Sequence, residues 1–139
     1  MKLLVVGRGL LGNGIVRCAL HDDLHPNETI DWSAPAVARD QLARMARSFA
    51  GSVGDTWRVA WCAGAGVVGT SDAQFLDEQS YLETFLDALA GAMTVAAAGR
   101  GGLFFASSAG GVFGAGSSEA ITELSPETPV SAYGESKLV

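Results

Sequence analysis

The chain has 139 residues, the usual size of one domain, and this length predicts one compact unit. Apolar residues make up 48% of it and charged residues 17%, a balance that excludes general disorder. The net charge of −6 provides no basic face for nucleic acid or for an anionic membrane, so we expect neither as a partner. The 18 glycines indicate loops where the backbone turns sharply or approaches a ligand closely.

The cysteines and the start of the chain bear on the cellular compartment. Cys18 and Cys62 each lie in an apolar segment without partners at metal-ligand spacing, so we expect two buried, reduced thiols and no zinc site. The apolar run Leu3–Val6 is too short for a signal peptide, and no run of about 18 apolar residues is present. We therefore expect a cytoplasmic protein.

Short apolar runs alternate with segments of helical periodicity along the chain. Strands are predicted at Leu3–Val6, Thr29–Trp32, Trp57–Cys62 and Leu103–Ser107. Helices are predicted at about 10–21, Ala36–Ala50 and Asp72–Ala98, with a last one from Tyr133. Residues 109–131 are predicted to form a long loop, which is a candidate for function. This order predicts an α/β fold with a doubly wound parallel sheet, truncated after the last helix.

Two of the predicted helices carry an apolar stripe that marks the expected core. In the second helix the stripe consists of Ala38, Leu42, Met45 and Phe49. In the third it consists of Leu82, Leu86, Leu89 and Met93. Both stripes are predicted to pack on the sheet.

Gly7-x-Gly9-x-x-Gly12 joins the first predicted strand to the first predicted helix. Glycines so placed allow a tight turn, close approach to a pyrophosphate, and close packing of helix on strand. The helix N-terminus offers free N–H groups and a dipole that favour an anion. The pattern therefore predicts a Rossmann-type dinucleotide site at Gly7, Gly9, Leu10, Leu11 and Gly12, with a plain strand-to-helix turn as the alternative.

Asp31 ends the second predicted strand, where a carboxylate accepts hydrogen bonds from the adenine ribose hydroxyls. The same carboxylate repels the 2′-phosphate of NADP. Arg8 points the other way, because a guanidinium in the glycine loop could pair with that phosphate. We expect NAD as the cofactor, with NADP as the alternative.

A second glycine pattern, Gly64-x-Gly66-x-x-Gly69, follows the third predicted strand. No helix is predicted to begin at these glycines, so they lack a helix terminus that could bind phosphate. We interpret this segment as a loop that approaches the cofactor closely.

Lys137 follows Tyr133 by four residues, and residues at this spacing share one face of a helix. The ammonium would stabilise the phenolate form of Tyr133, which could then act as a general base. Ser107 and Ser108, after the fourth predicted strand, offer a hydroxyl that could orient a substrate. The alternative is an ordinary surface helix turn.

Three segments in this order resemble the extended short-chain dehydrogenase/reductase family of NAD-dependent nucleotide-sugar epimerases and dehydratases. They are residues 7–12 (GRGLLG), 105–114 (FASSAGGVFG) and 132–138 (AYGESKL). Residues 121–126 (ITELSP) are similar to the loop that precedes the tyrosine in these enzymes. The resemblance covers essentially the whole chain but only the first half of the family's fold.

The resemblance implies a transient oxidation of a nucleotide sugar. Tyr133 would take the proton of a sugar hydroxyl while hydride passes to the nicotinamide, and Lys137 would hold the phenolate and the nicotinamide ribose. The third catalytic residue would be Ser108, with Ser107 as the alternative.

The resemblance also places the cofactor and possible partners. Ala63 and Gly64 would lie against the cofactor, and the helix that carries Tyr133 and Lys137 would form a homodimer face in a longer form. Epimerase, dehydratase and reductase chemistry all stay open. Dehydratase ranks lower because Ala109 stands where an acidic pair follows the hydroxyl in such enzymes.

The chain departs from the family between Asp31 and Cys62, where one helix fits and the family usually has a further strand. We expect a cofactor-binding portion, a fragment or truncated form that is inactive alone. The alternative is a non-catalytic dinucleotide-binding or regulatory module.

Overall fold

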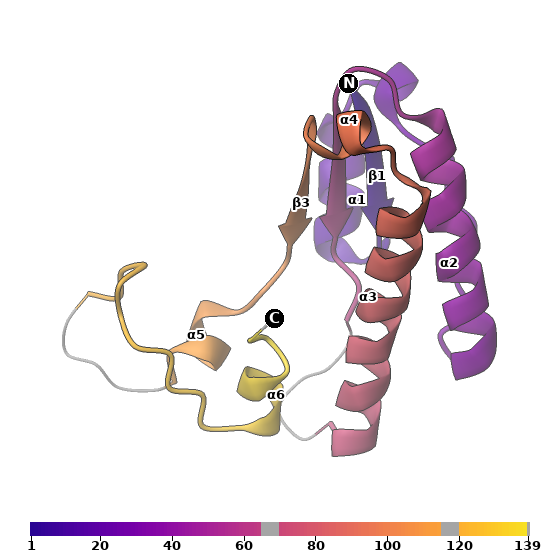
Figure 1. The fold of residues 1–139 in the computed structure, drawn as a ribbon. Helices are drawn as coiled ribbons and strands as arrows, with labels where there is room; N and C mark the ends of the chain where they lie inside the picture. The colour runs from indigo at the N-terminus through magenta and orange to yellow at the C-terminus, as the bar shows by residue number, and fades with distance from the viewer. Residues whose placement is uncertain (65–69, 115–119, 139) are drawn as a thin grey trace. The chain divides into compact units, whose positions relative to one another are not determined.

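The computed structural model describes residues 1–64, 70–114 and 120–138 (Figure 1). The length of the chain predicts one compact unit. In the structure, the contacts between residues divide the chain into two units. The sheet unit comprises Met1–Gly64 and Ser80–Ala106, and the second unit comprises the described residues of 65–79 and 107–139. We describe each unit by itself.

The sheet unit is built on three parallel strands in the order β1-β2-β3. They are β1 (Lys2–Val6), β2 (Trp57–Trp61) and β3 (Gly101–Phe105), which confirms three of the four predicted strands within two residues at each end. Val5 on β1, Ala60 on β2 and Phe104 on β3 stand in one row across the sheet. The ends of these strands therefore form one edge, where the predicted glycine loop begins.

Helices pack on both faces of the sheet. The main core joins Leu4, Val59 and Trp61 to helices α2 (Pro35–Ser52) and α3 (Asp72–Ala92). Helix α1 (Leu10–Cys18) takes the other face, where Gly12 lies over Val5 (Figure 1). The predicted α/β class with a parallel sheet and helices on two faces is confirmed, and it is compatible with a truncated Rossmann-like fold.

The predicted stripe of α2 is confirmed, since Ala38, Leu42, Met45 and Phe49 are all buried. Of the stripe predicted for the third helix, Leu82 and Leu89 on α3 are buried, while Leu86 and, just after α3, Met93 are partly buried against the core. Phe85 is fully buried as well, which the predicted stripe omitted.

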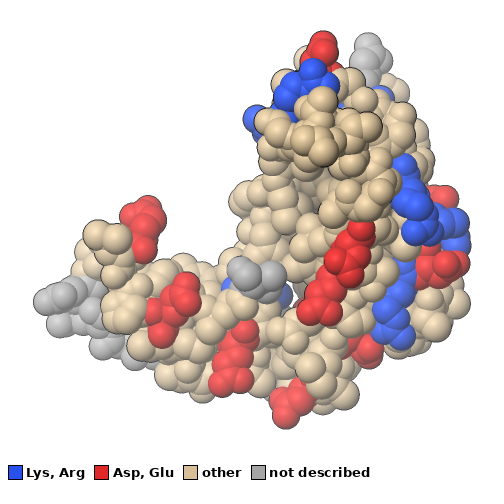
Figure 2. Space-filling model, viewed as in Figure 1, with Lys and Arg blue, Asp and Glu red and all other residues tan. Residues whose placement is uncertain are grey.

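Charge is distributed unevenly over the two long helices. Helix α3 carries five carboxylates and no Lys or Arg, namely Asp72, Asp77, Glu78, Glu83 and Asp87. Helix α2 mixes both signs, with Asp40 among its arginines. Figure 2 shows red side chains along α3 and both colours over α2.

The predicted helix Asp72–Ala98 is interrupted, contrary to the prediction. Helix α3 ends at Ala92, and a separate turn, α4 (Val95–Ala98), follows. The Oγ1 of Thr94 accepts a hydrogen bond from the Ala97 N–H at 3.2 Å and so begins α4. A threonine in this position competes for backbone N–H groups, which is why the helix breaks here.

The predicted strand Thr29–Trp32 is wrong. After a short 3₁₀ turn (His21–Asp23), Leu24 bridges Leu3 in parallel, and His25 N–H donates to the Leu3 carbonyl at 2.8 Å. The place beside β1 is therefore taken by a segment that begins at Leu24. Further along this segment, backbone groups bond to a side chain of α2 rather than to a strand.

Strand β3 is more exposed than its apolar sequence predicts. Leu103 is 43% and Phe104 52% exposed, and these neighbours point to opposite faces of the sheet. No described strand pairs with the outer edge of β3. The strand predicted at Leu103–Ser107 ends at Phe105 in the structure, and none of its residues is fully buried.

The second unit contains two single-turn helices, α5 (Ala109–Val112) and α6 (Ala132–Glu135). Helix α5 interrupts the predicted loop 109–131, of which residues 115–119 lie outside the described part. The predicted last helix is only α6, because Ser136 and Lys137 continue as a turn. Among the helices that the structure describes, none is long and apolar enough to cross a membrane.

Gly101 and Gly102 provide a matched test of the packing at β3. A Cβ on Gly101 would lie 1.7 Å from Cε2 of Trp57, whereas one on Gly102 would meet only the flexible Arg58 side chain at 3.7 Å. We predict that Gly101→Ala lowers the free energy of unfolding by about 1–3 kcal/mol. Gly102→Ala should change it by less than about 0.5 kcal/mol. Urea titration checks both variants, and equal losses would contradict the packing.

Candidate functional site

The turn between β1 and α1 depends on Gly7. Its φ of +88° lies in the region that favours glycine. A Cβ here would lie 2.3 Å from the backbone nitrogen of Ala63 and 2.5 Å from the carbonyl carbon of Cys62. The turn therefore packs backbone against backbone at the end of β2, where Cys62 N–H also donates to the Val6 carbonyl at 2.7 Å.

Gly12 has a structural task as well, whereas Gly9 has none among the described residues. A Cβ on Gly12 would lie 1.9 Å from the Gly7 carbonyl oxygen, so only glycine lets α1 pack this closely. Gly9 is the N-cap of α1, has a φ of −72°, and would direct a Cβ into open space. The fold explains two of the three glycines and leaves the middle one facing an open surface.

The first turn of α1 is open to solvent. No side chain caps the N-terminus of α1, whose N-cap residue is Gly9, and Leu10 is 92% exposed. Leu11 is also exposed. Free N–H groups at an uncapped helix start attract anions.

Asn13 fixes the loop from the helix side. Its Nδ2 donates to the Arg8 carbonyl at 2.5 Å, and its Oδ1 accepts from Arg8 Nε at 3.4 Å. The Arg8 guanidinium is thereby drawn toward α1. The sequence patterns missed Asn13, although it directly follows Gly12.

Ala63 and Gly64 follow β2, as predicted. Ala63 is half-buried against Gly7, which it contacts from the end of the neighbouring strand. Gly64 is exposed and has a φ of +129°. Gly66 and Gly69, the rest of the second glycine pattern, lie outside the described residues.

Asp31 is exposed and lies in a loop rather than in a strand. Its Oδ1 accepts hydrogen bonds from the N–H of Ser33 at 3.1 Å and from its hydroxyl at 2.6 Å. These bonds leave Oδ2 without a partner among the described residues. The carboxylate is ordered by its own turn and still presents one oxygen to a ligand.

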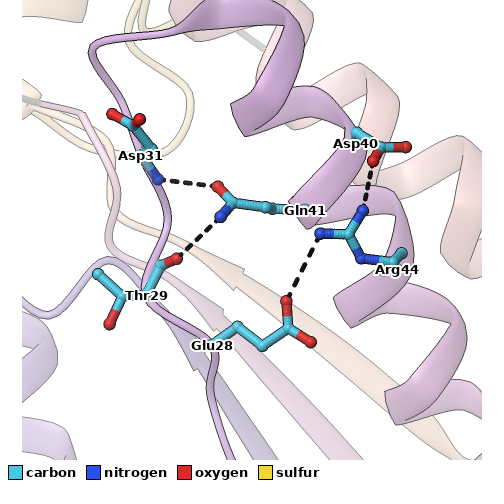
Figure 3. A network of polar contacts seen from close by, with 6 residues as sticks. All are labelled: Glu28, Thr29, Asp31, Asp40, Gln41 and Arg44. Carbon is cyan, nitrogen blue, oxygen red and sulfur yellow. Dashed lines mark hydrogen bonds and ion pairs between the residues drawn. The ribbon is translucent and has the colours of Figure 1, made fainter.

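A glutamine on α2 substitutes for the strand partner that the loop lacks (Figure 3). Gln41 Oε1 accepts from the Asp31 N–H at 2.8 Å, and Nε2 donates to the Thr29 carbonyl at 3.2 Å. Nearby, Arg44 pairs with Asp40 and lies 3.9 Å from Glu28. No sequence pattern points to this role of Gln41, because glutamine is common on exposed helix faces.

His25 ties the same segment to α2 further upstream. The Ser52 hydroxyl donates to the Phe49 carbonyl at 2.8 Å, so its oxygen is left to accept from His25 Nδ1 at 3.1 Å. His25 Nε2 then faces the Ser48 hydroxyl at 3.5 Å as an acceptor. Burial lowers the pKa of His25, and Lys2 lowers it further.

The second unit brings Ser108 and Tyr133 together around a glycine. The Oγ of Ser108 caps α5 by accepting from the Gly111 N–H at 3.3 Å. A Cβ on Gly111 would lie 3.2 Å from Cε1 of Tyr133 and 3.3 Å from Oγ of Ser108, so both side chains border this position. Gly134 on α6 approaches Gly111 more closely still, since a Cβ on Gly134 would lie 2.3 Å from the Gly111 carbonyl oxygen.

Lys137 joins this cluster with its ammonium. Its Nζ lies 5.5 Å from the centre of the Tyr133 ring and 3.8 Å from Oε2 of Glu78. Ser107 does not reach Tyr133 in the described contacts; its hydroxyl donates to the Lys137 carbonyl at 3.0 Å. Of the two serines, Ser108 is therefore the one that borders the same position as the tyrosine.

The predicted site residues fall into separate groups. Gly7, Gly12 and Ala63 are in contact, and Gly9 lies within the same turn. Asp31 belongs to the sheet unit but has no described contact with the turn. The serine, tyrosine and lysine belong to the second unit.

Neither cysteine is part of these groups. Cys18 is exposed, which corrects the expectation of two buried thiols, and Cys62 is half-buried. Burial raises the pKa of the Cys62 thiol. Over the described residues, no three His, Cys, Asp or Glu side chains could together hold a metal ion.

Comparison with known proteins adds no relative. No family model matches the chain, and no curated protein or solved structure is detectably similar to it.

The burial of His25 predicts that stability depends on pH. Its folded-state pKa lies below the unfolded value of about 6.5, so its contribution is complete above pH 6.5 and is lost as pH falls toward the folded value. We predict that the melting temperature falls less in His25→Gln than in wild type between about pH 7 and pH 5. The exposed His21 is the control, and His21→Gln should keep the wild-type decline. An identical decline in all three proteins would contradict this account.

Proposed function

We propose that the chain binds a dinucleotide of the NAD type on the turn Gly7–Gly12. The observation that carries the proposal is the open position at Gly9, which lies between two glycines that the fold requires. A missing side chain at an exposed, uncapped helix start is what close approach of a pyrophosphate needs. The exposed first turn at Leu10 and Leu11 and the neighbouring Ala63 and Gly64 would line the same ligand.

Asp31 supports NAD over NADP in this proposal. Its second carboxylate oxygen is available to ribose hydroxyls and would repel a 2′-phosphate. Arg8 favours NADP less than its sequence position suggests, because Asn13 bonds to its Nε. We keep NADP as the alternative.

We further propose that Ser108, Tyr133 and Lys137 carry out proton transfer on a nucleotide sugar. NAD, when bound, accepts and returns a hydride. Tyr133 takes the proton of the sugar hydroxyl that is oxidised, Ser108 orients that hydroxyl, and Lys137 stabilises the phenolate. The position of Ser108 and Tyr133 beside Gly111, and of Lys137 between Tyr133 and Glu78, supports these roles together with the family resemblance. The reaction class is an epimerase, reductase or, less favoured by Ala109–Gly110, a dehydratase.

The second candidate function is a non-catalytic dinucleotide-binding or regulatory module. One observation favours it: the glycine turn and Asp31 lie in the sheet unit, whereas the serine, tyrosine and lysine lie in the other unit. Binding alone requires only the sheet unit.

Gly9 and Gly14 provide a matched pair for the binding proposal. Neither glycine would direct a Cβ toward any atom within 4 Å, so alanine at either position should leave the fold intact. We predict that Gly9→Ala weakens NADH binding about tenfold or more, because a methyl group there blocks the pyrophosphate, an effect of about 1.4 kcal/mol. Gly14→Ala should bind like wild type. Nicotinamide fluorescence measures both affinities, and equal affinities would contradict the proposal.

Tyr133 and Tyr81 provide the pair for catalysis. Assayed in the longer form that the family resemblance implies, Tyr133→Phe should reduce hydride exchange between NAD and nucleotide sugars about 10²–10⁴-fold, since the general base is lost, while NADH affinity is kept. Tyr81→Phe retains the buried ring and should keep activity. Activity is followed as nicotinamide absorbance with a panel of nucleotide sugars. Full activity of Tyr133→Phe would exclude the catalytic role, and NADH binding without any exchange in that longer form would favour the module.

A further inference from the structure

The charged end of Lys137 lies in a partly buried setting within the second unit. Its side chain is 10% exposed, and that of Glu78, 3.8 Å away, is 22% exposed. Removing an ammonium from water is costly unless an opposite charge stands beside it. The Glu78 carboxylate supplies this charge, and it comes from α3 rather than from the segment that carries Lys137.

Backbone bonds anchor Lys137 but do not orient its side chain. Its N–H donates to the Gly134 carbonyl at 3.0 Å, and its own carbonyl accepts from the Ser107 hydroxyl. The four-carbon stem can still take many rotamers from this anchor. Helix α5 has no charged residue, and Glu135 on α6 is exposed. The direction of the stem is therefore set by contacts at Nζ.

Two of these contacts are with Oε2 of Glu78, at 3.8 Å, and with the Tyr133 ring, whose centre lies 5.5 Å away. We propose that Glu78 is a positioning residue for Lys137, because its carboxylate holds the ammonium within reach of Tyr133. The catalytic meaning of this inference rests on the proposed function, in which Lys137 stabilises the Tyr133 phenolate.

Acylation of the amine tests the proposal without any cofactor. The chain has two lysines, so Lys2 serves as an internal standard. In Glu78→Gln, Lys137 loses the ion pair that holds its amine in this partly buried position, so the amine moves more freely and meets the reagent more often. We expect the Lys137-to-Lys2 labelling ratio with acetic anhydride, measured by mass spectrometry, to rise about threefold or more.

Two variants separate positioning from general loss of structure. Glu78→Asp keeps the charge and should restore most of the wild-type labelling ratio. Glu83→Gln removes an exposed carboxylate of the same helix and should leave the ratio unchanged. A wild-type ratio in Glu78→Gln, or a rise in Glu78→Asp as large as in Glu78→Gln, would overturn the proposal.

The same proteins distinguish this inference from the proposed function. NADH titration of wild type reports on the glycine turn and does not depend on Glu78. A changed labelling ratio without NADH binding would keep Glu78 as the residue that positions Lys137 and would remove the proposed function. NADH binding with an unchanged ratio would do the reverse.

Discussion

The close backbone contact between Gly7 and the end of β2 is the constraint on which the candidate binding turn depends. A positive φ at Gly7 turns the chain out of β1, and the absence of a Cβ lets Cys62 and Ala63 approach it. Gly12 then packs directly on the Gly7 carbonyl, which sets where α1 begins. These contacts of Gly7 and Gly12 determine the shape of the turn. They leave the N-terminus of α1 and the backbone of Gly9 exposed at the edge of the sheet.

The second unit uses small residues in the same way. Gly111 and Gly134 let α5 and α6 approach until backbone meets backbone, and Ser108 and Tyr133 border the space at Gly111. A helix of one turn has little stability of its own, so these contacts and the serine caps must hold it. Glu78 then supplies from α3 the charge that Lys137 needs.

The sequence predicted most of the fold because its apolar patterns were strong. The apolar run Leu3–Val6 is typical of a strand inside a sheet, and the apolar stripe of α2 is typical of a helix that packs on one. The strand prediction at Thr29–Trp32 failed because the backbone groups of this segment bond to the Gln41 side chain instead of to a neighbouring strand. Gln41 lies on α2, outside the segment, so no local pattern reveals this contact. Of the site, the tight turn at Gly7 and the close helix packing at Gly12 could be predicted from spacing. The position of Glu78 could not, because tertiary packing alone brings it to Lys137.

The most direct test of the account is a titration of the isotope-labelled chain with NADH, followed by amide NMR. The account predicts saturable shifts centred on Gly9, Leu10 and Leu11, which line the open start of α1, with smaller ones at Ala63 and Gly64. Shifts confined to other residues, or none from a chain that gives the dispersed spectrum of a folded protein, would contradict it.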